Sequence, residues 1–143
     1  MATKSPEGIT LLESKLLPFP FERVQRLIQA HRACFSEIHP HAKSVRQEAD
    51  ALAAEQQCES CGTNITVQTK LTVNPDSIEV EFSNGPATGS ILTMYEPFPG
   101  GTRVSSESNF KSQNLNDDEL AEFIQKYVDR SYLDNLQYLQ SIG

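Results

Sequence analysis

The segment that decides the fold is Asn116–Leu139, NDDELAEFIQKYVDRSYLDNLQYL. An asparagine that can cap a helix is followed by two acidic residues and then by Glu119, an order that is favourable at the positive N-terminal end of a helix. Apolar side chains then recur at helical spacing. They are Leu120, Phe123, Ile124, Tyr127, Val128, Leu136 and Leu139. The segment therefore predicts a long amphipathic helix of about seven turns, which needs a broad apolar surface to cover it.

A series of strands before this helix is predicted to form that surface. Thr63–Val73 alternates between two sets of residues without a break, which is typical of a strand with one buried and one solvated face. Further strands are predicted over residues 78–82, 88–95 and 102–110, with a turn at 74–76 and a break at 97–101. Together these segments predict an antiparallel meander.

The segment 43–57 is harder to assign. Its alanines and glutamates favour a helix, whereas Val45, Gln47, Ala49, Ala51 and Ala53 can also alternate with polar neighbours. We predict a single strand here.

The N-terminal part of the chain predicts a strand followed by a helix. Ile9–Leu17 is rich in Leu and Ile and ends at Pro18-Phe19-Pro20, where a proline can leave an extended segment and open a helix. The next apolar residues recur at helical spacing, so an amphipathic helix is predicted over about 21–30 or beyond. A second short helix is predicted over His31–Ile38, before His39-Pro40 disfavours the helical conformation.

This order of elements predicts an α+β fold in which a curved antiparallel sheet wraps around the long C-terminal helix. The sequence contains no internal repeat, low-complexity tract or linker, and 143 residues suffice for one hydrophobic core. We therefore expect a single domain over residues 1–143.

Composition and charge exclude several classes of protein. The formal net charge is −7, and the 12 lysines and arginines are scattered rather than clustered, so nucleic acid is not an expected partner. No run approaches the ~20 apolar residues that span a bilayer, and the first residues lack the order of a secretory signal. We expect a cytoplasmic protein without a membrane span.

Three segments carry a resemblance to a known family. They are Leu17–Val24, with the sequence LPFPFERV, Gly89–Pro97, with the sequence GSILTMYEP, and Gly101–Val104, with the sequence GTRV. With the order of elements, they resemble the START-like superfamily, also called Bet v 1-like or SRPBCC, and GTRV is similar to a turn in its polyketide cyclase and dehydrase relatives. The resemblance implies a helix-grip fold with a cavity for a hydrophobic small molecule between the sheet and the last helix. Members of this superfamily range from carriers to cyclases, lyases and hydroxylase subunits.

Candidate ligand-binding residues follow from this arrangement. We predict that the cavity is lined by the strand face that carries Val104 and Ser106, and by Tyr95 and Tyr127, because an apolar pocket with few hydroxyls suits a small ligand with a polar tip. The alternative for the tyrosines is that they are core residues. His31 lies near the buried stripe of the first helix, where it could face the cavity or be a hydrogen-bonded residue at its boundary.

Two functions are compatible with this cavity. The first is binding of a small hydrophobic molecule. The alternative is a polyketide cyclase- or dehydratase-like enzyme, which requires a titratable side chain that points inward, such as His31 or Tyr127. No catalytic residue can be assigned, because the sequence contains no defensible catalytic triad, phosphate-binding glycine loop or close carboxylate pair.

Cys58-Glu59-Ser60-Cys61-Gly62 is the motif with the character of a metal site. Two thiolates separated by two residues can bind one structural Zn²⁺, which would stabilise an interaction module. The other ligands would come from His31, Cys34, His39 or His41. A continuous strand over 43–57 would carry the histidines roughly 50 Å away from the cysteines, unless this segment folds back or a second subunit of a homodimer contributes. The alternative is that Cys58 and Cys61 are free thiols or form a labile disulfide.

Overall fold

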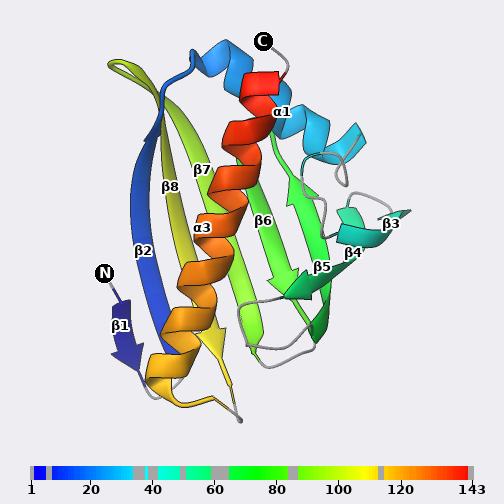
Figure 1. Cartoon of the computed structure of the whole chain (residues 1–143), viewed down its shortest axis with the longest axis vertical. Coiled ribbons are helices and arrows are strands. Elements are labelled where there is room, and N and C mark those ends of the chain that lie inside the picture. The colour runs from blue at the N-terminus through cyan, green and yellow to red at the C-terminus, as the bar shows by residue number, and fades with distance from the viewer. Residues whose placement is uncertain are drawn as a thin grey trace.

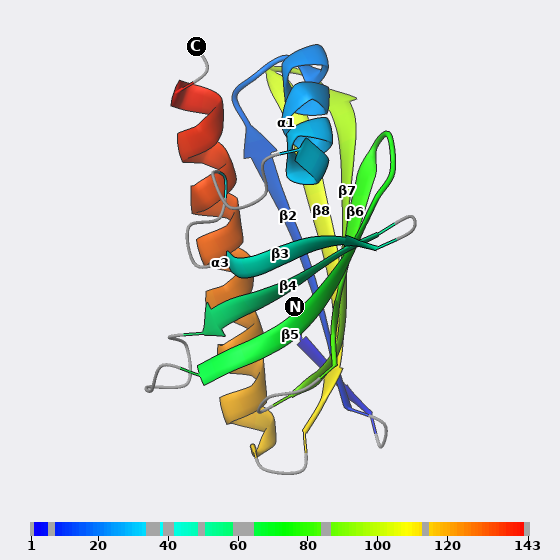
Figure 2. The ribbon, with the colours of Figure 1, turned by 90° about the vertical axis from the view of Figure 1, so that its right-hand side faces the viewer.

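The computed structural model describes residues 2–5, 8–33, 38, 42–48, 51–58, 65–83, 87–112 and 115–141. Within them the chain forms one curved antiparallel sheet and two helices, and the long C-terminal helix crosses the concave side of the sheet (Figure 1). This arrangement confirms the predicted α+β helix-grip fold. Seen from the side, the sheet bends around the helix, and the first helix covers the sheet near the C-terminal end of the last one (Figure 2).

The strands are β1 Ala2–Ser5, β2 Gly8–Leu17, β3 Ala42–Glu48, β4 Ala51–Cys58, β5 Ile65–Val73, β6 Ser77–Phe82, β7 Thr88–Phe98 and β8 Gly101–Lys111. The helices are α1 Phe21–Ala33 and α3 Asp117–Ser141. The order across the sheet is β1-β2-β8-β7-β6-β5-β4-β3, so the described strands follow a meander except that β2 pairs with β8. This pairing places the start of the chain beside the strand that leads into α3.

The N-terminus of α3 has the geometry that the sequence predicts. The Asn116 side-chain oxygen accepts a hydrogen bond from the Glu119 backbone N–H at 2.8 Å, and a Glu119 carboxylate oxygen accepts one from the Asn116 N–H at 3.0 Å. This reciprocal capping box pairs two N–H groups that the first helical turn leaves without partners. The helix then continues for 25 residues.

Two core clusters hold α3 against the sheet. Near its N-terminus, Phe123 packs edge to face against Phe82 and Phe110, with ring centroids 6.4 and 6.3 Å apart, and Phe82 and Phe110 are themselves 5.1 Å apart. Near its C-terminus, the fully buried Leu139 packs in a cluster with α1 residues such as Leu27. Burial of these large apolar groups supplies most of the stabilisation of the helix, because a helix in isolation is marginal in water.

The prediction of one strand over 43–57 was wrong. The segment forms two strands, β3 and β4, and Glu48 pairs with Ala51, so the chain reverses between them. The sequence misleads because no Gly or Pro marks this reversal, and the alternation continues through it. Ala42 pairs with Gln56, so the two ends of the hairpin lie together, and the span of roughly 50 Å expected of one continuous strand does not apply to this segment.

Other boundaries differ less from the predictions. β7 continues through Pro97 to Phe98, three residues beyond the predicted end at Tyr95, and Phe98 pairs with Gly101 across a tight turn. β1 was not predicted. The predicted helix over residues 31–38 is partly continuous with α1, which extends to Ala33, and residues 34–37 lie outside the described part of the chain.

Among the described residues, no helix is long and apolar enough to cross a membrane.

We predict that Asn116→Ala destabilises the protein by about 1 kcal/mol, because it removes the acceptor for the Glu119 N–H. Urea unfolding followed by circular dichroism measures this change. Asn116→Asp keeps an acceptor at the cap and is expected to unfold at the wild-type midpoint. Equal stability of the alanine variant and the wild type would contradict the role of the cap.

Candidate functional site

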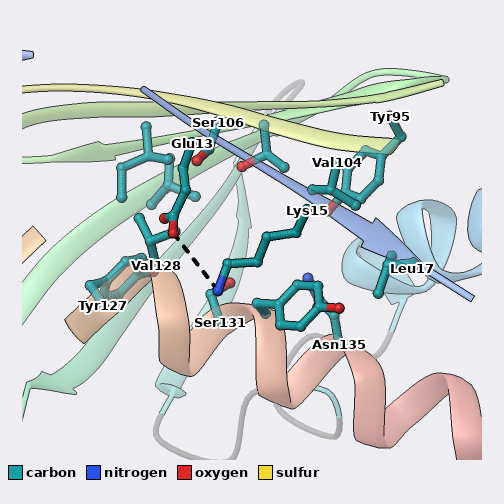
Figure 3. A pocket seen from close by; sticks show the side chains of 14 residues that line it. Glu13, Lys15, Leu17, Tyr95, Val104, Ser106, Tyr127, Val128, Ser131 and Asn135 are labelled. Atoms are coloured by element: carbon teal, nitrogen blue, oxygen red, sulfur yellow. Dashed lines mark ion pairs between the residues drawn. The ribbon is translucent and has the colours of Figure 1, made fainter. Parts of the chain in front are cut away.

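A pocket of about 50 Å³ lies between the concave face of the sheet and α3 (Figure 3). Its walls come from β2, β6, β7, β8 and α3, and they combine apolar side chains with a smaller number of polar ones. The lining residues are Glu13, Lys15, Leu17, Val80, Ile91, Thr93, Tyr95, Val104, Ser106, Tyr127, Val128, Ser131, Tyr132 and Asn135. Members of both core clusters are among them, so the pocket lies where the two clusters meet.

Strand register explains why these side chains meet. Across β2, β8 and β7, Lys15 pairs with Val104 and Val104 pairs with Tyr95, so the three residues form one row on the inner face. Two residues further along the same face, Glu13 pairs with Ser106. Because side chains alternate between faces, every second residue of each strand points toward α3.

The structure brings together four of the five predicted ligand-binding residues. Tyr95, Val104, Ser106 and Tyr127 line the pocket. His31 does not line it. It is buried in α1, and because its Nδ1 lies 2.8 Å from the Leu27 carbonyl oxygen, this nitrogen donates the hydrogen bond. The role of all five residues in ligand binding stays a prediction.

A polar network between β2 and α3 was not predicted from the sequence. The Gln125 side-chain amide donates to both carboxylate oxygens of Glu13, at 3.1 and 3.0 Å, and to Asp129 Oδ1 at 2.9 Å. Lys15 Nζ lies 3.1 Å from Asp129 Oδ1 and 3.8 Å from Glu13 Oε1. Glu13 and Lys15 lie between the buried Leu11 and Leu17 at the same two-residue spacing, and this spacing is the signal that could have placed them on the inner face.

Asn135 is a further pocket residue that was not predicted from the sequence. It is 7% exposed, and its side-chain oxygen has no hydrogen-bond partner in the described part of the chain. Its spacing of four residues before Leu139 places it on the apolar stripe of α3, which was the available signal. An uncharged amide on this stripe therefore forms part of the wall of the pocket.

Tyr95 contributes an uncharged phenol to the same wall. It is 4% exposed, and burial raises the pKa of its hydroxyl far above the ordinary value for tyrosine, because the phenolate would lose its hydration. The group stays protonated at neutral pH and can donate or accept a hydrogen bond.

A metal centre is not found among the described residues. No group of three or more His, Cys, Asp or Glu side chains there could hold a metal ion. Cys58 ends β4, whereas Cys61, Cys34, His39 and His41 lie outside the described part of the chain. The zinc knuckle of Cys58 and Cys61 therefore stays a prediction.

Comparisons with solved structures show the fold. A START superfamily protein from Mycobacterium smegmatis matches with a TM-score of 0.72 and 9% identity, over 94% of this chain and 99% of that one. Ara h 8.0201 matches with a TM-score of 0.68 and 16% identity, over 92% and 97%. One half of StfQ, a di-domain ARO/CYC protein of the steffimycin biosynthetic pathway, matches with a TM-score of 0.62 and 10% identity, over 92% of this chain and 50% of StfQ. No protein-family model and no curated protein matches the sequence.

The buried Tyr95 hydroxyl predicts a loss of stability at alkaline pH. Its pKa is raised in the folded state above the 10.0 of the unfolded chain, so the unfolded state releases its proton first as the pH rises. Above pH 10.0, the free energy of unfolding should therefore fall by about 1.4 kcal/mol for each pH unit from this group alone. Urea unfolding at a series of alkaline pH values measures the slope. Tyr95→Phe should show a shallower slope, and equal slopes would contradict the prediction.

Proposed function

We propose that this chain, which has the START/Bet v 1-like helix-grip fold, binds a small hydrophobic molecule in the pocket beneath α3. The observation that carries the proposal is the pocket itself, which lies between two packed core clusters and has a mainly apolar wall. Protein cores are normally close-packed, so a space of this kind at the centre of the sheet–helix interface is a candidate for a binding site.

The size of the pocket limits what can enter without a change of shape. Its volume of about 50 Å³ exceeds the ~10–15 Å³ that one water needs, and it is smaller than the ~150 Å³ engineered cavity in another protein that binds benzene. A ligand with more than a few heavy atoms therefore has to move side chains or separate α3 from the sheet. We expect small ligands, or larger ones that bind with a displacement of α3.

The polar network between β2 and α3 is the set of contacts that such a displacement would break first. Lys15, Glu13 and Asp129 join β2 to α3 beside the pocket, and Lys15 Nζ also lies 4.8 Å from the centroid of the Tyr132 ring. These side chains are partly exposed, so each contact contributes little by itself. An opening at this side would break weak, solvated interactions and leave the aromatic core cluster in place.

An enzyme that uses the same pocket is the second candidate. The observation that favours it is that two titratable side chains, Glu13 and Lys15, line the pocket in place of the predicted His31. StfQ, whose description includes ARO/CYC, shares the fold over one half of its length. Against this candidate, both Glu13 oxygens accept hydrogen bonds from Gln125 and Lys15 is paired with Asp129, so neither group is available as a free base.

The remaining expectations from the sequence belong to the same proposal. We expect the protein to act in the cytoplasm. We also expect it to act without nucleic acid, in keeping with its net charge of −7. A homodimer and a structural zinc at Cys58 and Cys61 stay predictions. Native mass spectrometry would report the subunit number, bound zinc and any bound ligand in one measurement.

We predict that Ser106→Phe weakens binding of a neutral fluorescent probe, N-phenyl-1-naphthylamine, because the added ring fills the pocket. A fluorescence titration measures the affinity, which should fall at least ~10-fold, corresponding to about 1.4 kcal/mol. Circular dichroism checks that the variant folds, since overpacking can cost about 1–3 kcal/mol.

Ser105→Phe is the matched control. Ser105 precedes Ser106 on β8 and points to the opposite face of the sheet, so the same ring there leaves the pocket unchanged. It should bind the probe with wild-type affinity. Unchanged binding by the folded Ser106→Phe variant would place the probe elsewhere and refute the proposal.

A Glu13→Gln variant distinguishes catalysis from simple binding. Glu13→Gln keeps the shape of the side chain and removes its charge, so probe affinity should stay within about 2-fold of the wild type if the pocket only binds. If the pocket also catalyses a reaction through this carboxylate, turnover of an aromatic polyketide test substrate should fall by about 10²–10⁴-fold in the variant. Absence of turnover in the wild type would remove the enzyme candidate for that substrate class.

A further inference from the structure

We propose that the ligand of this pocket carries an uncharged hydrogen-bond donor, a hydroxyl or an amide N–H, and presents it to the side-chain oxygen of Asn135. This inference rests on the proposed function, because it names the chemical class of the molecule that enters the pocket. Asn135 is the residue that would select this class of ligand.

The first observation is an unpaired polar atom on a residue that lines the pocket. Asn135 is 7% exposed, and its Oδ1 has no hydrogen-bond partner among the described residues, although the residue lines the pocket. Buried polar side-chain atoms nearly always have a partner, and leaving one unpaired costs stability. A leucine would fit the apolar stripe of α3 without this cost. An asparagine at this position is therefore better explained by a molecule that pairs with it.

The second observation is the position of the amide relative to the other walls. Ser131 lies one helical turn before Asn135 and also lines the pocket, and Figure 3 shows both on the α3 side, with Tyr95 and Val104 on the sheet side. The neutral Tyr95 phenol and the Ser131 hydroxyl can each accept or donate a hydrogen bond. A ligand group that meets Asn135 therefore has two further hydroxyls among the pocket walls, and the apolar body of the ligand can contact side chains such as Val80 and Val128.

The third observation is that the charges of the pocket are already paired. Lys15 contacts Asp129 and Glu13, and Glu13 accepts two hydrogen bonds from Gln125. A carboxylate on the ligand would meet the Asn135 oxygen, which can only accept, without a free cation in the pocket wall. A buried unpaired charge is costly, so an acid is a poor fit. A neutral alcohol, phenol or amide satisfies Asn135 without this cost.

Ser108 provides an internal comparison. Its hydroxyl oxygen is also buried without a hydrogen-bond partner in the described residues, but Ser108 does not line the pocket. It pairs with Leu11 and Ile91, which belong to the core cluster of the phenylalanines. Removing the Asn135 amide, which belongs to a pocket residue, can thus be compared with removing the Ser108 hydroxyl, which lies outside the pocket.

The test uses three ligands that share one ring and differ in one group. 4-Ethylphenol carries a donor, 4-ethylanisole carries an acceptor without a donor, and 4-ethylbenzoate carries a negative charge. Their affinities are measured by isothermal titration calorimetry at neutral pH. We expect wild-type protein to bind 4-ethylphenol about 10-fold more tightly than 4-ethylanisole, and 4-ethylbenzoate more weakly than both.

Asn135→Leu and Ser108→Ala are the matched variants. In Asn135→Leu the preference for the phenol over the anisole should fall to about 2-fold or less, with the anisole bound at least as tightly as by wild type. Ser108→Ala should keep the 10-fold preference. Asn135→Leu should also melt at a temperature equal to or higher than that of the wild type, since it removes an unpaired buried group. If the leucine variant does not fold, Asn135→Ala takes its place.

The outcomes separate this inference from the proposed function. Equal affinity of the wild type for the phenol and the anisole, or tighter binding of the benzoate, would overturn the inference while showing that the pocket binds small apolar molecules. A preference that survives in Asn135→Leu would assign donor recognition to another group and would also overturn it. If none of the three ligands and no neutral probe binds the wild type, the proposed function fails, and the inference fails with it.

Discussion

Burial of the apolar stripe of α3 against the concave face of the sheet is the constraint on which the rest of the structure depends. A helix of 25 residues with one apolar side cannot be stable in water without a surface of matching length. The sheet provides that surface by curving, and α1 closes the end near Leu139. At the other end the rings of Phe82, Phe110 and Phe123 interlock edge to face, which fixes the distance between the helix and the sheet.

The pocket follows from how this interface is filled between its two ends. Large apolar groups face the sheet near both ends of α3, whereas the intervening turns present the smaller Val128, Ser131 and Asn135 alongside the rings of Tyr127 and Tyr132. The opposing positions of β8 carry Val104 and Ser106, which are also small. Because the ends of the helix are held by bulky residues, the middle cannot collapse to bring these smaller side chains into contact. A space remains, with its few polar groups fixed on rigid elements.

The network around Lys15 has a structural role as well as a place in the pocket. β2 pairs with β8 along one side, and on its other side β1 covers only residues 8–11, so the second half of β2 is an open edge among the described strands. Charged side chains that point inward are one way in which proteins prevent such an edge from pairing with another molecule. Here the charges are satisfied by Gln125 and Asp129 of α3, and Tyr132 donates a hydrogen bond to the Leu16 carbonyl oxygen. The edge is thereby covered by the same helix that covers the pocket.

The sequence by itself determined the elements whose signals are local: the Asn116 cap, the stripe of α3, the alternation in β5 and β6, and the inner face of β8 with Val104 and Ser106. These signals depend on helical and strand periodicity, which are properties of neighbouring residues. Only the tertiary structure decided the reversal between β3 and β4, the exclusion of His31 from the pocket, and the meeting of Glu13 and Lys15 with Gln125 and Asp129. Each of these depends on which strands pair, in what register, and how α3 is placed across them. Contacts between residues more than 100 positions apart leave no local pattern in the chain, and Asn135 acquires its meaning only when the fold buries it.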